Sequence, residues 1–159
     1  MKLLDPHHQQ LALSILERSA DLTLATIRAD GTPHASTVSF AHDGLLLYAA
    51  IAIDSHKAHD IHLNPRVALT VNAPYRDWNE IQGLSIDATA SMLDEPLESR
   101  RASELLLAKF PQYAGVVADT TSLPWPGMLF IRFAPRVVSV LDYTVRFGHL
   151  ETFEVAAEV

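Results

Sequence analysis

Residues 45–71 read LLLYAAIAIDSHKAHDIHLNPRVALTV and decide the fold. The stretch opens with an almost unbroken apolar run, 45–51, which predicts a strand buried on both faces. Ser55 is a favoured helix-capping residue, and the segment SHKAHDIHL that begins there predicts a short helix. Asn64-Pro65 ends this helix, because the residue before a proline is disfavoured in the α region. The next segment, RVALTV, alternates apolar and polar residues and predicts another strand.

The segments on either side of this stretch add mostly antiparallel strands. Asp30-Gly31 and Asp43-Gly44 supply the positive φ that tight hairpin turns require. Other elements are expected in this order: a helix over 5–19, a strand over 82–93, a helix over 94–110, strands over 129–133 and 137–141 around Pro135, and an irregular tail from 142. This order predicts a single, mainly β domain over 1–159 with a few flanking helices, either a small barrel or a sandwich.

The composition excludes several classes of protein. The chain has 159 residues, 48% of them hydrophobic, a formal net charge of −7 and no cysteine. A chain of this length can bury a core without disulfides, and the lack of cysteine excludes thiolate catalysis and cysteine-based metal sites. The acidic balance disfavours nucleic acid or an anionic membrane as a partner. No apolar segment is long enough to cross a membrane and no leader peptide is recognisable, so we expect a cytoplasmic location.

The start of the predicted short helix has the chemistry of an anion site. Backbone amides at a helix N-terminus lack partners within the helix and carry a partial positive charge. Ser55 adds a hydroxyl, Lys57 adds a full charge, and His56 adds another when it is protonated. This pattern predicts a local phosphate site in an otherwise acidic protein, although an ordinary serine-capped helix with a surface lysine has the same sequence.

Four segments occur in a distinctive order over roughly residues 20–143: LATIRADGTPHASTVSF, DGLLLYAA, SHKAHDIHLNPRVALTV and IQGLSIDATASML. This order resembles the FMN-binding split-barrel family typified by pyridoxamine 5′-phosphate oxidase. The resemblance implies a six-stranded antiparallel split β-barrel that works as a homodimer, with FMN at the subunit interface. It implies an oxidoreductase that transfers a hydride between a reduced nicotinamide or small organic substrate and an acceptor, as a general family member rather than the vitamin B6 oxidase itself.

The resemblance also implies which residues hold the cofactor. Ser55, His56 and Lys57 would bind the FMN phosphate. The flavin would be lined by residues from three strands: Ser36, Thr37, Val38, Ser39, Ala50, Ile51 and Gln82. Basic residues of the family pattern are replaced here at Ser36, Ala41 and His56. These departures leave haem or a deazaflavin as alternative ligands, with His149 or His56 as the iron ligand, and a non-catalytic dimeric binding protein as a further alternative.

Loop residues are further candidates. Trp78, Trp125, Arg146 and His149 are expected either to contact the substrate or the partner subunit, or only to cover the core and latch the C-terminus. His56, His59 and His62 recur at every third position of the short helix without a complete ligand set, so no metal site is expected. No side chain is an evident catalytic acid or base, which fits chemistry carried by the cofactor.

Overall fold

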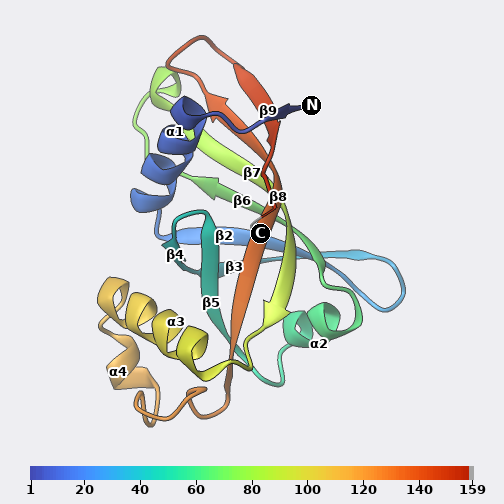
Figure 1. Cartoon of the computed structure of the whole chain (residues 1–159), viewed down its shortest axis with the longest axis vertical. Helices are drawn as coiled ribbons and strands as arrows, with labels where there is room; N and C mark the ends of the chain where they lie inside the picture. The colour runs from blue at the N-terminus through green and yellow to red at the C-terminus, as the bar shows by residue number, and fades with distance from the viewer. Residues whose placement is uncertain (158–159) are drawn as a thin grey trace.

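The computed structural model describes residues 1–157, in which four α-helices and one short 3-10 helix surround a sheet (Figure 1). The helices are α1 (Pro6–Glu17), α2 (His56–Leu63), η1 (Trp78–Glu80), α3 (Pro96–Lys109) and α4 (Tyr113–Val116). The strands are β1 (Lys2–Leu3), β2 (Asp21–Ile27), β3 (Pro33–Ser39), β4 (Ala41–Asp43), β5 (Leu46–Ala52), β6 (Arg66–Asn72), β7 (Gln82–Met92), β8 (Met128–Asp142) and β9 (Leu150–Glu154). Residues 158–159 of the expected domain lie outside the described part. None of these helices is long and apolar enough to cross a membrane.

The strands form one mixed sheet that curls into an open barrel. Its order is β1-β9-β8-β7-β6-β2-β3, and β5 joins through β8. Every pair is antiparallel except β1 with β9. β3 and β5 approach each other without forming a ladder, and we call this opening the split. The fold is therefore the expected mainly β split barrel, although the sheet has nine strands within residues 1–157 rather than six.

The long strand β8 replaces the two strands expected around Pro135. One edge of β8 pairs with β7, while the other pairs first with β5, up to Phe133, and then with β9, from Val137. Pro135 lies between the β5–β8 ladder, which ends at Phe133, and the β8–β9 ladder, which begins at Val137. Its missing N–H therefore breaks no hydrogen bond on that edge. The register of the β7–β8 ladder shifts between Asp87 and Ala88, where Arg136 of β8, next to the proline, has no partner in β7. The proline thus marks a change of partner rather than the end of a strand.

β5 is buried on both faces, which confirms the prediction from its apolar sequence. Leu47, Ala49 and Ile51 belong to the core inside the barrel, which α1 and α2 also cover. Tyr48 and Ala50 point the other way, into a smaller core beneath α3. In Figure 1 α3 lies alongside β5. Because both faces are covered, β5 is fixed in place even though its edge at the split is open.

The C-terminal segment is not the irregular tail that the sequence predicted. The chain turns at Gly148, whose φ of 77° requires a glycine, and returns as β9 between β8 and β1. His8 on α1 bonds to Asp5 (2.7 Å) and to Glu151 on β9 (2.8 Å), so it fastens the N-terminal helix to the C-terminal strand. A five-residue strand with one buried side chain, Phe153, has too little pattern to be recognised in the sequence.

The connection through His8 makes stability depend on pH in a defined direction. Burial alone would lower the pKa of His8, but its hydrogen bonds to Asp5 and Glu151 outweigh burial and raise it above the ordinary 6.5. The hydrogen bond from His8 is the main cause that lowers the pKa of Glu151 below 4.5. The histidine therefore stabilises the fold at low pH and loses this effect as pH rises, whereas the carboxylate loses its effect as pH falls.

We expect His8→Ala to lower the melting temperature most between pH 4.5 and pH 6.5, the ordinary pKa values of Glu151 and His8, and least at alkaline pH. Thermal unfolding followed by circular dichroism at about pH 5.5 and about pH 8.5 measures the difference. His7→Ala, which removes the exposed neighbouring histidine, is the matched control. An equal loss for His8→Ala at both pH values would contradict this role of His8.

Candidate functional site

α2 begins where the sequence predicts, with Ser55 as its N-cap. The Ser55 hydroxyl accepts a hydrogen bond from the Ala58 amide (3.2 Å) and donates its proton to the Ala52 carbonyl (2.7 Å). Since a hydroxyl has only one proton, Ser55 stabilises the helix start rather than offering a donor to a ligand. The amides of His56 and Lys57 occupy the first two helical positions and are the donors available to an anion.

The residues expected to line a flavin from the second and third strands lie on the two sides of the split. β3 pairs only with β2, and β5 pairs with β4 only over Leu46–Tyr48 on the edge that faces β3. In 36–39 and 49–52, the backbone N–H and C=O groups that point away from β2 and β8 therefore border the split without a ladder partner among residues 1–157. α2 follows β5 after a turn at 53–54, so its N-terminus lies at one end of the split.

The side chains beside the split differ in what they offer. Val38 and Ile51 are buried in the barrel core and give the split an apolar floor. Ser39 donates to Asp21 (3.0 Å) and is therefore already engaged. Ser36 is half-buried. It lies on the same face of β3 as Val38, which points into the barrel, because residues two apart on a strand share a face. A ligand in the split would meet mainly backbone groups, Ser36 and the start of α2.

Gln82 does not join these residues within one chain. It begins β7, and the far end of that strand, Met92, lies beside α2 (Figure 1). Eleven residues of strand at about 3.3 Å each separate the two ends by roughly 33 Å. The Gln82 side chain donates to Asp142 (3.2 Å) and accepts from Arg18 (2.6 Å). Gln82 therefore lies at the end of β7 that is far from the start of α2.

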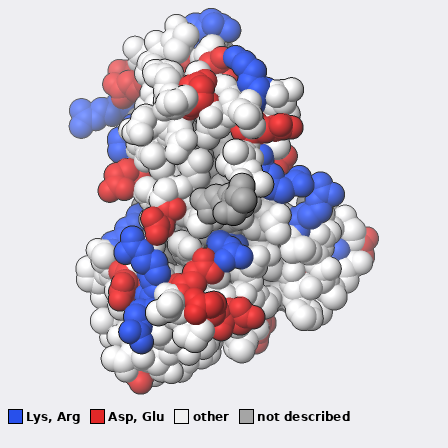
Figure 2. All heavy atoms as spheres, viewed as in Figure 1, with Lys and Arg blue, Asp and Glu red and all other residues white. Residues whose placement is uncertain are grey.

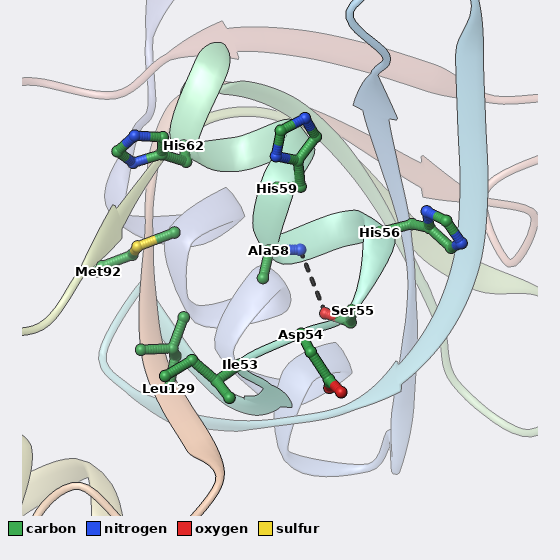
Figure 3. Close-up of a pocket in the computed structure, with 9 residues that line it drawn as sticks. All are labelled: Ile53, Asp54, Ser55, His56, Ala58, His59, His62, Met92 and Leu129. Atoms are coloured by element: carbon green, nitrogen blue, oxygen red, sulfur yellow. Dashed lines mark hydrogen bonds between the residues drawn. The ribbon is translucent and has the colours of Figure 1, made fainter.

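A groove of about 480 Å³ opens beside the start of α2. It is lined by the following residues, shown in Figure 3: Ile53, Asp54, Ser55, His56, Ala58, His59, His62, Met92 and Leu129. The rings of His56 and His62 point to opposite sides of the helix, with His59 between them. Within residues 1–157 no three His, Asp or Glu side chains are arranged to hold a metal ion. The groove combines imidazoles from the helix with an apolar wall from the strands.

The two tryptophans named from the sequence have opposite surroundings. Trp125 has 0% exposure and lies beneath α3, with ring centroids 4.9 Å from Tyr113 and 5.0 Å from Phe130. Of the two alternatives expected for Trp125, it covers the core, because the indole has no accessible surface. Trp78 on η1 is 67% exposed and lies 5.9 Å from the ring of Phe147. It remains available to a ligand or a second chain.

The two C-terminal candidates also differ. Arg146 is exposed in the turn after β8. The His149 ring lies largely buried and bonds to Glu151 (3.2 Å), the same carboxylate that His8 contacts. His149 therefore belongs to the connection between the two ends of the chain, whereas Arg146 projects from it.

A buried polar cluster was missed in the sequence. Asp60 on α2 is only 4% exposed, accepts from the Thr26 hydroxyl (2.8 Å) and lies 3.4 Å from the Nδ1 atom of His34. His34 could have been predicted to point inward, because it lies four residues before Val38 on β3 and therefore on the same face of the strand. Nothing comparable marked Asp60, because an aspartate in a short polar helix is ordinarily exposed.

The charge distribution makes any anion site a local one. Figure 2 shows acidic and basic side chains interspersed on the visible face, with no continuous basic area. A protein with a net charge of −7 does not attract anions at long range. Binding of a phosphate group therefore depends on the few donors placed at the start of α2.

The family model described as pyridoxamine 5′-phosphate oxidase matches residues 9–141. The chain belongs to this family. General stress protein 26 of Bacillus subtilis (strain 168) is 37% identical over 59 residues, which are 37% of this chain and 41% of that protein. The structure of general stress protein 26 from Bacillus anthracis str. Sterne has a TM-score of 0.66 at 19% identity, covering 91% of this chain and 98% of that chain.

A heme binding protein from Mycobacterium smegmatis has a TM-score of 0.78 at 15% identity, covering 96% of this chain and 60% of that chain. This chain thus spans less than two thirds of the length of both the B. subtilis and the M. smegmatis proteins. At such identities the two structures show that the pyridoxamine 5′-phosphate oxidase-like fold is shared, and they leave the ligand open.

The contrast between the tryptophans gives a stability test. We expect Trp125→Ala to lower the free energy of unfolding by about 3–5 kcal/mol, because it empties the centre of the core beneath α3. We expect Trp78→Ala to change it by no more than about 0.5 kcal/mol, as for other exposed positions. Urea unfolding measures both values. A Trp125→Ala protein as stable as the wild type would contradict the burial of this ring.

Proposed function

We propose that the chain binds FMN in the split and acts as an FMN-dependent oxidoreductase. The observation that carries this proposal is the meeting of two unpaired strand edges with a helix N-terminus that bears Lys57. The edges offer backbone donors and acceptors for a polar planar ring, and the helix start offers two amides and a charge for a phosphate. Both parts of the ligand are thus matched, the ring by the edges of β3 and β5 and the phosphate by the start of α2.

The residues of the chain fit this cofactor in charge as well as in shape. Lys57 is half-buried and makes no ion pair within residues 1–157, so its charge is available to a phosphate. Asp54, exposed just before the cap, opposes an anion there. Since Asp54 is exposed, solvent screens its carboxylate. The balance favours a phosphate close to the amides of His56 and Lys57.

FMN, when bound, supplies hydride transfer between a reduced nicotinamide or a small organic substrate and an acceptor. The backbone of 36–39 would orient the ring from β3, and the backbone at Ala50 and Ile51 would border it from β5, since these two side chains point to opposite faces of that strand. Backbone amides aimed at the polar edge of the ring favour negative charge there, because donors fixed in advance need no reorganisation. The proposal includes a homodimer, in which a second copy brings Gln82, and with it Trp78 and Arg146, toward the site, because Gln82 lies far from the start of α2 in its own chain.

Lys57→Ala tests the phosphate site. We expect it to raise the dissociation constant for FMN roughly tenfold or more, since a charged hydrogen bond contributes about 1.5–3 kcal/mol. Quenching of flavin fluorescence on titration with purified protein measures the constant, and a deazaflavin is titrated in the same way. Arg100→Ala removes an exposed cation from α3 and is the matched control. A wild-type protein that shows no flavin binding would sink the proposed function.

Haem binding is a second candidate, favoured by the groove rather than by the split. The groove brings His56, His59 and His62 beside Met92 and Leu129. Imidazole and thioether groups are ordinary axial ligands of haem iron, and the apolar wall suits a porphyrin face. Its volume lies within the usual range for small-molecule sites, roughly 300–1,000 Å³. His149 is a weaker candidate than His56, because its ring is engaged with Glu151.

The haem alternative is tested by an absorbance titration. We expect a Soret band on addition of haemin that is lost in a His56→Ala, His59→Ala, His62→Ala triple variant and kept in His149→Ala. Lys57→Ala serves as a further comparison, because it removes a cation that does not line the groove. Haem binding that survives the triple variant would exclude this groove as the site.

A further inference from the structure

The outer face of the sheet over β2, β6 and β7 lies open to water in a single chain. Along β6 the side chains alternate strictly between exposed and buried. On β7 the side chains of Leu84, Ile86 and Ala88 are buried in the barrel core, whereas those of Ser85 and Asp87 are exposed. The buried sides of α1 and α2 belong to the same barrel core and therefore lie on the inner side of these strands. We call the opposite side of the three strands the outer face.

Short side chains dominate the outer face. Its uncharged members include the following residues: Ala25, Ile27, Ala68, Thr70, Ser85 and Thr89. Neither lysine nor glutamate points outward from these three strands, although the chain has a net charge of −7. Charged residues are depleted at the cores of protein interfaces, and two sheets can pack face to face at about 10 Å. The outer face is therefore suited to a second sheet.

A groove of about 480 Å³ lies within the outer face, and three charged residues line it: Arg66 on β6, Asp87 on β7 and Arg136 on β8. All three are exposed, and none forms an ion pair within residues 1–157. Arg136 is the residue that the β7–β8 ladder skips, and such a bulge re-aims a side chain. Because β7 lies between β6 and β8, the carboxylate has a cation on each side. A surface with both signs of charge uncommitted complements a copy of itself.

The position of the groove along β7 determines what a second copy would bring. Identical chains form closed pairs about a two-fold axis, with the same surface of both copies in contact. Asp87 is the central residue of β7, with five residues of the strand on either side. A two-fold axis that lies between the two faces and runs across the strands beside Asp87 therefore reverses β7 of one copy over β7 of the other. The Gln82 end of each copy then faces the Met92 end of the other, which is the end beside α2.

We propose that a second copy of the chain binds to the outer face about such an axis, and that Asp87 of each copy pairs with Arg66 and Arg136 of the other. This inference rests on the proposed function, which includes a second copy without specifying the face that it covers. The arrangement gives two equivalent sites, each built from the α2 end of one chain and the Gln82 end of the other. The three charged residues select this register, because only opposite charges then meet.

The test reverses charge on the outer face. We expect Asp87→Arg, and separately the double variant Arg66→Glu, Arg136→Glu, to raise the dissociation constant of the dimer about a hundredfold or more, because like charges then face each other. An equimolar mixture of the two variants should dimerise again, since a wholly positive groove meets a wholly negative one. Sedimentation velocity of the FMN-free proteins measures the dissociation constant. Arg100→Glu, which reverses an exposed charge on α3, is the matched control, and circular dichroism checks folding.

Each outcome decides the inference. Variants that dissociate alone and associate when mixed support it, and either variant carries the test alone if the other does not fold. A monomeric wild-type protein, or variants that dimerise as the wild type does, overturns the choice of this face. Variants that dissociate but do not associate when mixed overturn the pairing of Asp87 with the arginines. FMN titration of the wild type is read separately: a dimer that behaves as expected but binds no FMN overturns the proposed function and leaves the outer face as the interface.

Discussion

The structure depends on β8 having two different partners along one edge. Its first half pairs with β5 and its second half with β9, while β7 pairs along the opposite edge. Since β5 and β9 share one edge, neither can extend past Pro135 into the ladder of the other. β5 is therefore carried away from β9 and toward β3. This arrangement brings β5 near β3 without aligning their edges, and the split follows from it.

The split in turn explains why a single helix is so important to the site. An open strand edge in water is a hazard for aggregation unless it is covered or occupied. α2 follows β5 directly and covers one end of the opening, anchored by Ala58 and Ile61 in the barrel core. Its first turn consequently lies beside backbone groups that lack ladder partners. Polar donors from a helix start and from two strands then meet at one place, without any need for a large basic surface.

The sequence predicted the elements that depend on local pattern and missed those that depend on partners. The strand at 46–52, the cap at Ser55 and the end of α2 at Asn64 were correct, because apolar runs and capping residues act over a few positions. β9 was missed, since its stability comes from β8 and β1. The sequence left open whether Trp125 contacts a ligand or covers the core, because only the packing of its loop under α3 decides between the two. Of the candidate site, the Ser55 cap and Lys57 were visible in the sequence, whereas the burial of Asp60 on the same helix was not.

Some basic side chains of this acidic protein are committed to the fold, whereas Lys57 is not. Lys109 donates to the carbonyls of Ser19 and Phe40, both at 2.7 Å, and joins the end of α3 to the sheet. Arg132 pairs with Glu98 beneath α3. Such cations stabilise the fold and are not available to a ligand. Lys57 has no such partner within residues 1–157. Because its charge stands beside the free amides of a helix start, the arrangement that an anion needs is confined to one place in a chain of negative net charge.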